Sequence, residues 1–238
     1  MATKTPRYAL ANPLSLLLDK PPADFTRADL LKVVESKGLE RITFHYTAID
    51  GKLKELTVPA SDPRHLEAVL AEGERVDGSS LFKGMVDMAL SDLYVVPQYR
   101  SAFLNPFDEG SLDFVCRYLA QDGSPAPFTP DSVLARAAAL FRKTTGLQLN
   151  ALGELEFFLL TNPADRSYPV EDHRGYHGSA PFTKSGPILH EMVAHIARVT
   201  GAVKYAHSEN GVIDGVRSDV PEIAGRLAEQ LEIEFLPR

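Results

Sequence analysis

The sequence predicts an α+β fold in two parts, and three observations carry this prediction. An amphipathic helical stretch near the start is followed by two strand-like segments around Asp50-Gly51, the dipeptide that favours a tight β-hairpin. The segment Asp122–Pro130 is rich in turn-forming residues and is the best candidate for a linker. After this linker, strand-like and helix-like segments alternate, which indicates the opening of a larger α/β unit.

The first part begins with a helix whose ends are marked in the sequence. Thr26 is a candidate N-cap for a helix through Lys37, and Gly38 is placed to end it. We expect residues 1–25, ahead of this helix, to form a surface tail or a short helix. The elements expected next are strands over 42–46 and 53–58, a helix over 63–71, a polar glycine-rich loop over 73–84, and strands over 93–96 and 111–119.

The second part opens with a helix in which Thr129 can cap, Pro130 takes the first helical position and Gly146 ends the pattern. Its expected apolar face consists of Val133, Leu134, Ala137, Ala138, Leu140 and Phe141. The elements expected next are a strand over 148–160, a polar loop to 178, a helix over 187–200, a strand over 202–207, a loop over 210–221 and a strand over 230–236. We expect the last strand to be an uncovered edge, which is an aggregation liability and hints at a truncated chain.

Composition excludes several classes of partner. The chain has 238 residues, a net charge of −7 and scattered Lys and Arg, so a surface for nucleic acid or an anionic membrane is not expected. No apolar run approaches the ~20 residues of a membrane span. Cys116 is the single cysteine and lies in an apolar run, which predicts a buried, inert thiol. The absence of an internal disulfide fits a reducing compartment, and we expect a cytoplasmic protein.

Paired carboxylates are the first candidate site. Glu154 and Glu156 are two apart in a predicted strand, so they project from the same face while Leu155 and Phe157 project from the other. Two adjacent carboxylates repel each other unless a cation lies between them, and Mg²⁺ or Mn²⁺ prefers such oxygen ligands. The alternative is a solvated strand face, which spacing alone does not exclude.

Two more strand segments carry acidic residues. One contains His207 and Glu209, and the other contains Glu232 and Glu234 on one face. Three such strands could converge on one metal cluster if they are neighbours in a sheet. They could equally be the polar outer faces of amphipathic strands.

Two loops hold further polar residues with no specific chemistry of their own. Asp77-Gly78-Ser79-Ser80 reads as a structural turn, and Tyr176 and His177 follow a glycine in a polar loop. The sequence has no phosphate-binding glycine loop of the Walker type, no GxGxxG and no CxxC.

Taken in order, these segments resemble the glutamine synthetase family from about Lys32 onward. The matching motifs are DGSS (77–80), SDLYVVP (91–97), AFLNPF (102–107), GELEFF (153–158), GYH (175–177), HSE (207–209) and EQLE (229–232). The resemblance implies a small β-grasp domain over 26–125 and the first portion of a catalytic domain, with a curved antiparallel sheet, over 126–238. It also implies that glutamine is made from glutamate, ammonium and ATP through γ-glutamyl phosphate, with two Mg²⁺ or Mn²⁺ ions.

Residue roles follow from the same resemblance. It implies that Glu156, Glu209 and Glu232 hold the metal nearer glutamate, and that Glu154 holds the metal nearer the nucleotide. It assigns Asp77 as the base that deprotonates ammonium, Ser80 and Tyr176 to the ammonium pocket, and His207 to cofactor binding. It further implies a ring-shaped homo-oligomer in which Asp77 completes the active site of a neighbouring subunit.

The family's remaining metal ligands and its phosphate-binding arginines would follow residue 238. We therefore expect these 238 residues alone to make no glutamine. Two other functions stay open: a related γ-glutamyl ligase that uses another amine, because only His207 precedes Glu209 and the segment 213–226 is long, and a truncated, non-catalytic interaction module.

Overall fold

The computed structural model describes residues 8–86, 91–162 and 167–237, which form two compact units, 1–149 and 150–238. The helix expected to open the second part, α5 (Pro130–Thr145), contacts β6 and lies in the first unit. The domain division at residue 125 stays a prediction. Within the described residues, no helix has both the length and the apolar character needed to cross a membrane.

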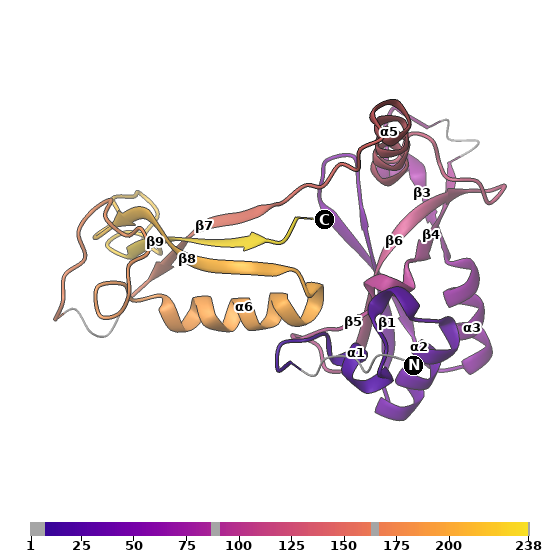
Figure 1. Cartoon of the computed structure of the whole chain (residues 1–238), viewed down its shortest axis with the longest axis horizontal. Helices are drawn as coiled ribbons and strands as arrows, with labels where there is room; N and C mark the ends of the chain where they lie inside the picture. Colours follow the sequence, from indigo (N-terminus) through magenta and orange to yellow (C-terminus); the bar gives the residue numbers. More distant parts are fainter. Residues whose placement is uncertain (1–7, 87–90, 163–166, 238) are drawn as a thin grey trace. The chain divides into compact units, whose positions relative to one another are not determined.

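The first unit is built on a mixed sheet in the strand order β2-β1-β6-β4-β3, with β5 also paired to β6 (Figure 1). The central neighbours β1 and β6 are parallel, and the other pairs are antiparallel. Phe44 of β1 and Phe114 of β6 are fully buried and pack edge to face. The strands are β1 (Arg41–Thr47), β2 (Leu53–Pro59), β3 (Glu74–Asp77), β4 (Asp92–Pro97), β5 (Phe103–Leu104) and β6 (Ser111–Ala120). This mixed sheet with its helices confirms the α+β prediction.

The helices of this unit begin and end largely where local signals predict. In α2 (Arg27–Lys37), Thr26 and Asp29 form a reciprocal capping box, and Gly38 ends the helix with φ of 61°. Lys20 pairs with Asp29 at 2.8 Å and ties the preceding segment to this helix. The other helical elements are α1 (Pro13–Leu18), η1 (Pro22–Asp24), α3 (Pro63–Glu72), α4 (Gly78–Leu81) and η3 (Tyr99–Ser101).

Three details of the first unit differ from the sequence prediction. The segment over 73–84, expected to be a loop, contains β3 and α4, because β3 pairs with β4. Gly73, just before β3, allows the two backbones to approach closely. A Cβ on Gly73 would lie 2.3 Å from the carbonyl oxygen of Val95. Thr129 stands at the N-cap of α5, but its hydroxyl donates to the Ala126 carbonyl and does not cap the helix. The expected apolar face of α5 is largely exposed, including Leu134 at 67%.

The second unit is a three-stranded antiparallel sheet in the order β7-β9-β8, with α6 along one face (Figure 1). Its elements are β7 (Glu154–Thr161), α6 (Gly186–Thr200), β8 (Val203–Ile213) and β9 (Leu227–Phe235). The expectation that the final strand is an uncovered edge is wrong, because β9 is hydrogen-bonded on both sides. β8 also continues through 210–213, which were expected to lie in a loop.

An apolar core joins α6 to one face of this sheet. Leu189, Met192, Val193 and Ile196 of the helix pack with Phe157, Leu159, Leu231 and Ile233 of the strands. At the N-terminus of α6, the buried carboxylate of Glu229 accepts hydrogen bonds from the Ser185 hydroxyl, at 2.5 Å, and from the Lys184 backbone N–H, at 2.8 Å. Glu229 therefore anchors the start of α6 to β9.

Two irregularities interrupt β8. The register slips by one residue between Val203 and Tyr205 and by two residues between Ser208 and Val212. Such bulges place extra residues on one strand and re-aim their side chains. The first bulge contains Lys204, and the second contains Glu209. Both bulges therefore affect where charged side chains of β8 lie relative to the sheet.

Candidate metal centre

The sheet face opposite α6 gathers the acidic residues of all three strands, and we call it the carboxylate face. In the β7–β9 register Glu154 lies opposite Glu234, and Glu156 lies opposite Glu232. On the other side of β9, His207 of β8 lies opposite Glu232. The members of the carboxylate face are Glu154, Glu156, His207, Glu209, Glu232 and Glu234. The sheet thus brings together the three carboxylate-bearing strands, as convergence on one site requires.

Two groups on this face have ligand atoms close enough to share one cation. The ligand atoms of His207, Glu209 and Glu232 all lie within 4.8 Å of one another, and so do those of Glu154, Glu232 and Glu234. His207 Nδ1 is 3.4 Å from Glu209 Oε1, and its Nε2 is 3.9 Å from Glu232 Oε1. Glu232 belongs to both groups and is the centre of the site.

The electrostatics of Glu232 show how densely charge is packed here. Burial raises the pKa of its carboxyl above the usual value, and the neighbouring carboxylates Glu154, Glu209 and Glu156 raise it further, against the lowering effect of His207. Like charges held this close favour protonation unless a cation compensates them. The donor set of carboxylates and one imidazole fits Mg²⁺ or Mn²⁺, so the residues present fit the metal that the family resemblance implies.

Glu156 is held by an amide bridge across the sheet. The side-chain nitrogen of Gln230 donates to Glu156 Oε1 at 2.5 Å, and its oxygen accepts from the backbone N–H of Gly211 at 3.0 Å. Gly211 lies in the second bulge of β8, and a Cβ there would lie 2.3 Å from Gln230 Oε1 and 2.7 Å from the ring of Phe158. Gln230 therefore links a candidate ligand on β7 to the bulge that carries Glu209.

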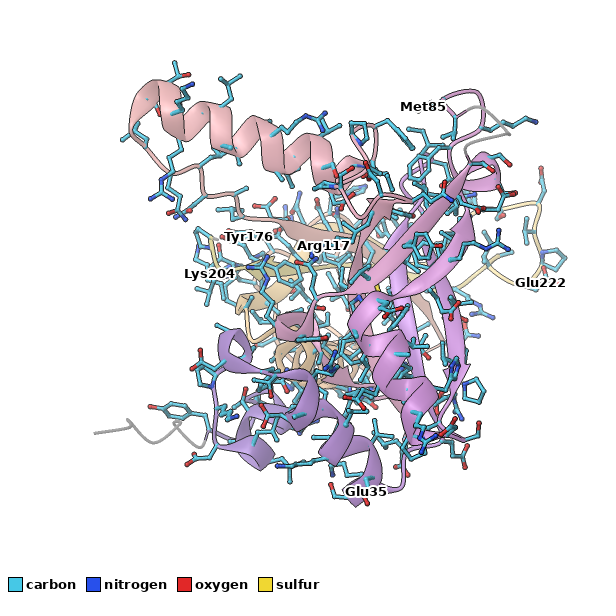
Figure 2. All side chains as sticks on the ribbon, turned by 90° about the vertical axis from the view of Figure 1, so that its right-hand side faces the viewer. Glu35, Met85, Arg117, Tyr176, Lys204 and Glu222 are labelled. Carbon is cyan, nitrogen blue, oxygen red and sulfur yellow. The ribbon has the colours of Figure 1, made fainter. Side chains whose placement is uncertain are left out.

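A cation of the protein itself lies at the other end of the face. Lys204 Nζ contacts Glu234 Oε1 at 2.6 Å and lies 4.6 Å from the ring centre of Tyr205. The hydrogen bond from Lys204, together with that from Tyr205, lowers the pKa of Glu234. Lys204 is labelled in Figure 2.

A chain segment along β8 adds aromatic rings beside the first group. Gly175 and His177 donate backbone hydrogen bonds to the carbonyls of Asn210 and Ser208. This places the Tyr176 ring on that of His177, with centroids 4.2 Å apart, and the His177 ring 4.3 Å from that of His207. Tyr176, labelled in Figure 2, is 61% exposed, so it borders the site from the solvent side.

The remaining two candidate residues belong to the first unit. Asp77 is the N-cap of α4, and its carboxylate accepts hydrogen bonds from the hydroxyl of Ser80, at 2.6 Å, and from the hydroxyl and backbone N–H of Ser79. The hydrogen bonds from Ser80 and Ser79 lower the pKa of Asp77 to about 2. Asp77 and Ser80 therefore act as one unit, with the carboxylate ionised at neutral pH.

Sequence reasoning missed three residues of the site. Gln230 stands inside a motif that was noted only for its glutamates, while Lys204 and Tyr205 lie in the segment 202–207, which was expected only to form a strand. A signal for the bulge was present, since Val203 and Ala206 are both apolar but three apart, a spacing that regular alternation does not give. The role of Glu229 at α6 also has no counterpart in the sequence pattern.

Comparisons with known proteins found relatives in both sequence and fold. Residues 38–121 match the model of the glutamine synthetase β-grasp domain. Glutamine synthetases of Staphylococcus epidermidis and Staphylococcus aureus are 26% identical over 194 residues, which cover 79% of this chain and 43% of theirs. A structure of GmaS without ligand superposes with a TM-score of 0.63 at 17% identity, covering 88% of this chain and 45% of that one. The structure of the Plasmodium falciparum glutamine synthetase superposes with a TM-score of 0.62 at 17% identity, covering 90% of this chain and 44% of that one.

Proposed function

We propose that this chain is a member of the glutamine synthetase family and serves the ATP-dependent ligation of ammonia to the γ-carboxylate of glutamate through γ-glutamyl phosphate. The observation that supports the proposal best is the convergence of Glu154, Glu156, Glu209 and Glu232 on one sheet face around a carboxyl whose pKa is raised. A face of this composition suits a divalent cation and is costly without one.

In this proposal Mg²⁺ or Mn²⁺ is held around Glu209 and Glu232, with Glu156 on the adjacent strand. In the whole enzyme Glu154 contributes to a second ion, together with ligands that are not among these 238 residues. When bound, the ions neutralise carboxylate and phosphate oxygens so that the anionic reactants can approach. Gln230 orients Glu156, and His207, next to both Glu209 and Glu232, serves nucleotide and cation binding.

Asp77, Ser80 and Tyr176 are proposed for the ammonium side of the reaction. A carboxylate with its pKa near 2 stays ionised and attracts ammonium, whereas it holds an abstracted proton only weakly. Asp77 therefore suits ammonium binding and proton relay better than proton storage. We propose that it acts in the site of a neighbouring subunit of a ring-shaped homo-oligomer.

The chain spans 43% of the length of the curated relatives. The reaction, the substrates glutamate, ammonium and ATP, the ring-shaped assembly and a cytoplasmic location are accordingly proposals for the whole enzyme. We expect the 238 residues alone to bind the cation but to make no glutamine.

The test separates cation binding from ligation. Mn²⁺ binding to the purified chain is measured by equilibrium dialysis, with Glu232→Gln as the test variant and Glu222→Gln as the control. Glu222 is exposed, lies on the loop between β8 and β9, and is labelled in Figure 2. Loss of at least tenfold in affinity, about 1.4 kcal/mol, is expected for Glu232→Gln and no change for Glu222→Gln. Equal affinity in all three proteins would refute the cation site.

Ligation is then tested with the downstream half of the Staphylococcus aureus enzyme appended to the chain. ATP, Mg²⁺ and glutamate are supplied with ammonium or, in parallel, with methylamine or putrescine. Glutamine formation with ammonium is the expected result. Turnover with an alkylamine and none with ammonium would replace the proposal with the related γ-glutamyl ligase, and no turnover with any amine would favour the interaction module.

A further inference from the structure

Lys204 reaches the carboxylate face because the strand that carries it is bulged. Val203 lies opposite Phe235, yet Tyr205 lies opposite Glu234, so Lys204 is the extra residue of the first bulge in β8. Val203 and Ala206, on either side, both pack into the apolar core under α6. The two residues between them must therefore both turn toward the opposite face.

The contacts of Lys204 are those of a built-in counter-ion. Its ammonium lies 2.6 Å from Glu234, whose side chain is only 6% exposed, and it also lies against the Tyr205 ring. A buried carboxylate without a partner is strongly disfavoured, so this ion pair stabilises Glu234 in its charged form. Glu234 is thus already matched with a positive charge supplied by the chain.

This pairing distinguishes the two groups that could hold a cation. The group of Glu154, Glu232 and Glu234 has one of its three carboxylates engaged by Lys204. The group of His207, Glu209 and Glu232 has no lysine or arginine partner among the ion pairs of the described residues. A divalent ion at Glu154, Glu232 and Glu234 would have to displace the ammonium or lie beside a like charge. An ion at His207, Glu209 and Glu232 meets neither obstacle.

We propose that Lys204 determines the number of divalent ions that the carboxylate face holds in the 238-residue chain by itself: one ion binds at His207, Glu209 and Glu232, and the ammonium of Lys204 takes the place of a second ion at Glu154, Glu232 and Glu234. The inference rests on the proposed cation site and adds to it a residue that sets its stoichiometry.

The experiment counts Mn²⁺ ions bound per chain at pH 7.5, using equilibrium dialysis with the free ion measured by electron paramagnetic resonance. The parent chain is expected to bind one ion. Lys204→Met, which keeps most of the side-chain length and removes the charge, is expected to bind two, the second with a dissociation constant on the order of 10⁻³ M or tighter. Lys204→Arg keeps the charge and is expected to bind one.

Two further variants locate the second ion and control for charge. Lys204→Met combined with Glu154→Gln is expected to return to one ion, because the new site loses a ligand. Arg174→Met breaks an exposed ion pair with Glu171 outside the carboxylate face and is expected to stay at one. Circular dichroism of each variant verifies that the fold is retained.

The outcomes separate this inference from the proposed function. Two ions in the parent, or one ion in a folded Lys204→Met, would overturn the role of Lys204 and leave the cation site standing. The parent stoichiometry tests the inference even if Lys204→Met does not fold. Absence of binding in every protein would overturn the cation site itself, and the inference with it.

Discussion

The contact between Glu229 and the start of α6 leads to a quantitative prediction about stability. Glu229 is 1% exposed and accepts from the Ser185 hydroxyl and the Lys184 backbone N–H. Glu229→Ala removes both acceptors and leaves two donors unpaired at a buried position. It also removes a negative charge from the N-terminus of a helix, where the helix dipole favours one.

The expected size of the effect follows from these contacts. Hydrogen bonds to charged groups contribute about 1.5–3 kcal/mol each, so the loss of two in Glu229→Ala should lower the free energy of unfolding by about 3–6 kcal/mol. For a unit of this size that corresponds to a fall of at least about 12 °C in Tm. Glu229→Gln keeps the shape and most of the hydrogen bonding but loses the charge, so a loss of about 1–2 kcal/mol is expected.

Urea unfolding followed by circular dichroism measures these losses, and hydrogen–deuterium exchange of residues 186–200 locates them. Exchange should accelerate in α6 for Glu229→Ala and stay unchanged in α2 and α3. Glu222→Ala, at an exposed position, is the control and should change stability by less than about 0.5 kcal/mol. A loss below about 1 kcal/mol for Glu229→Ala would refute the anchoring role.

Three further predictions concern the second bulge, the thiol and the capping box. Gly211→Ala should weaken Mn²⁺ binding by about 10- to 100-fold, because the added methyl displaces an amide that orients a ligand, while Gly186→Ala, where a Cβ meets open space, should leave binding unchanged in the same dialysis assay. Cys116 is buried, which raises the pKa of its thiol, so iodoacetamide should label it only in denaturant; rapid labelling of the folded chain would contradict this. The hydrogen bond from Lys20 lowers the pKa of Asp29 to about 2, so the stability it adds is present above its unfolded pKa of about 3.9 and is lost as pH falls through about 2. The Tm difference between the parent and Asp29→Asn should therefore shrink between pH 4 and pH 2, and a constant difference would count against the pairing.

Local signals predicted most of the helices and the hairpin, because the groups that form them are close in sequence. The Thr26 cap, the Gly38 stop and the Asp50-Gly51 turn each depend on a few neighbouring residues, and the structure confirms all three. The two-residue period of a strand likewise predicted that Glu154 and Glu156 lie on one face, and this prediction does not depend on which strands are their neighbours.

Features set by long-range pairing could not be predicted in the same way. The central position of β9 depends on hydrogen bonds to strands far away in sequence, and no local pattern distinguishes a central strand from an edge. The bulge that redirects Lys204 arises from the pairing of β8 with β9, in which Val203 lies opposite Phe235 and Tyr205 lies opposite Glu234. The roles assigned to Asp77, Ser80, Tyr176 and His207 came from family resemblance and stay predictions.

The central place of β9 has a consequence for the order in which the second unit forms. Among the described strands, β7 and β8 pair only with β9, which is synthesised after both. Pairing Glu154 with Glu234 closes a loop that contains almost the whole unit. The chain entropy lost in closing this loop must be spent before the sheet contributes any stabilisation. We expect a slow, cooperative folding step in which β9 docks last. The carboxylates converge in that same step, so their mutual repulsion opposes it, and a divalent cation present during refolding should accelerate the formation of the sheet.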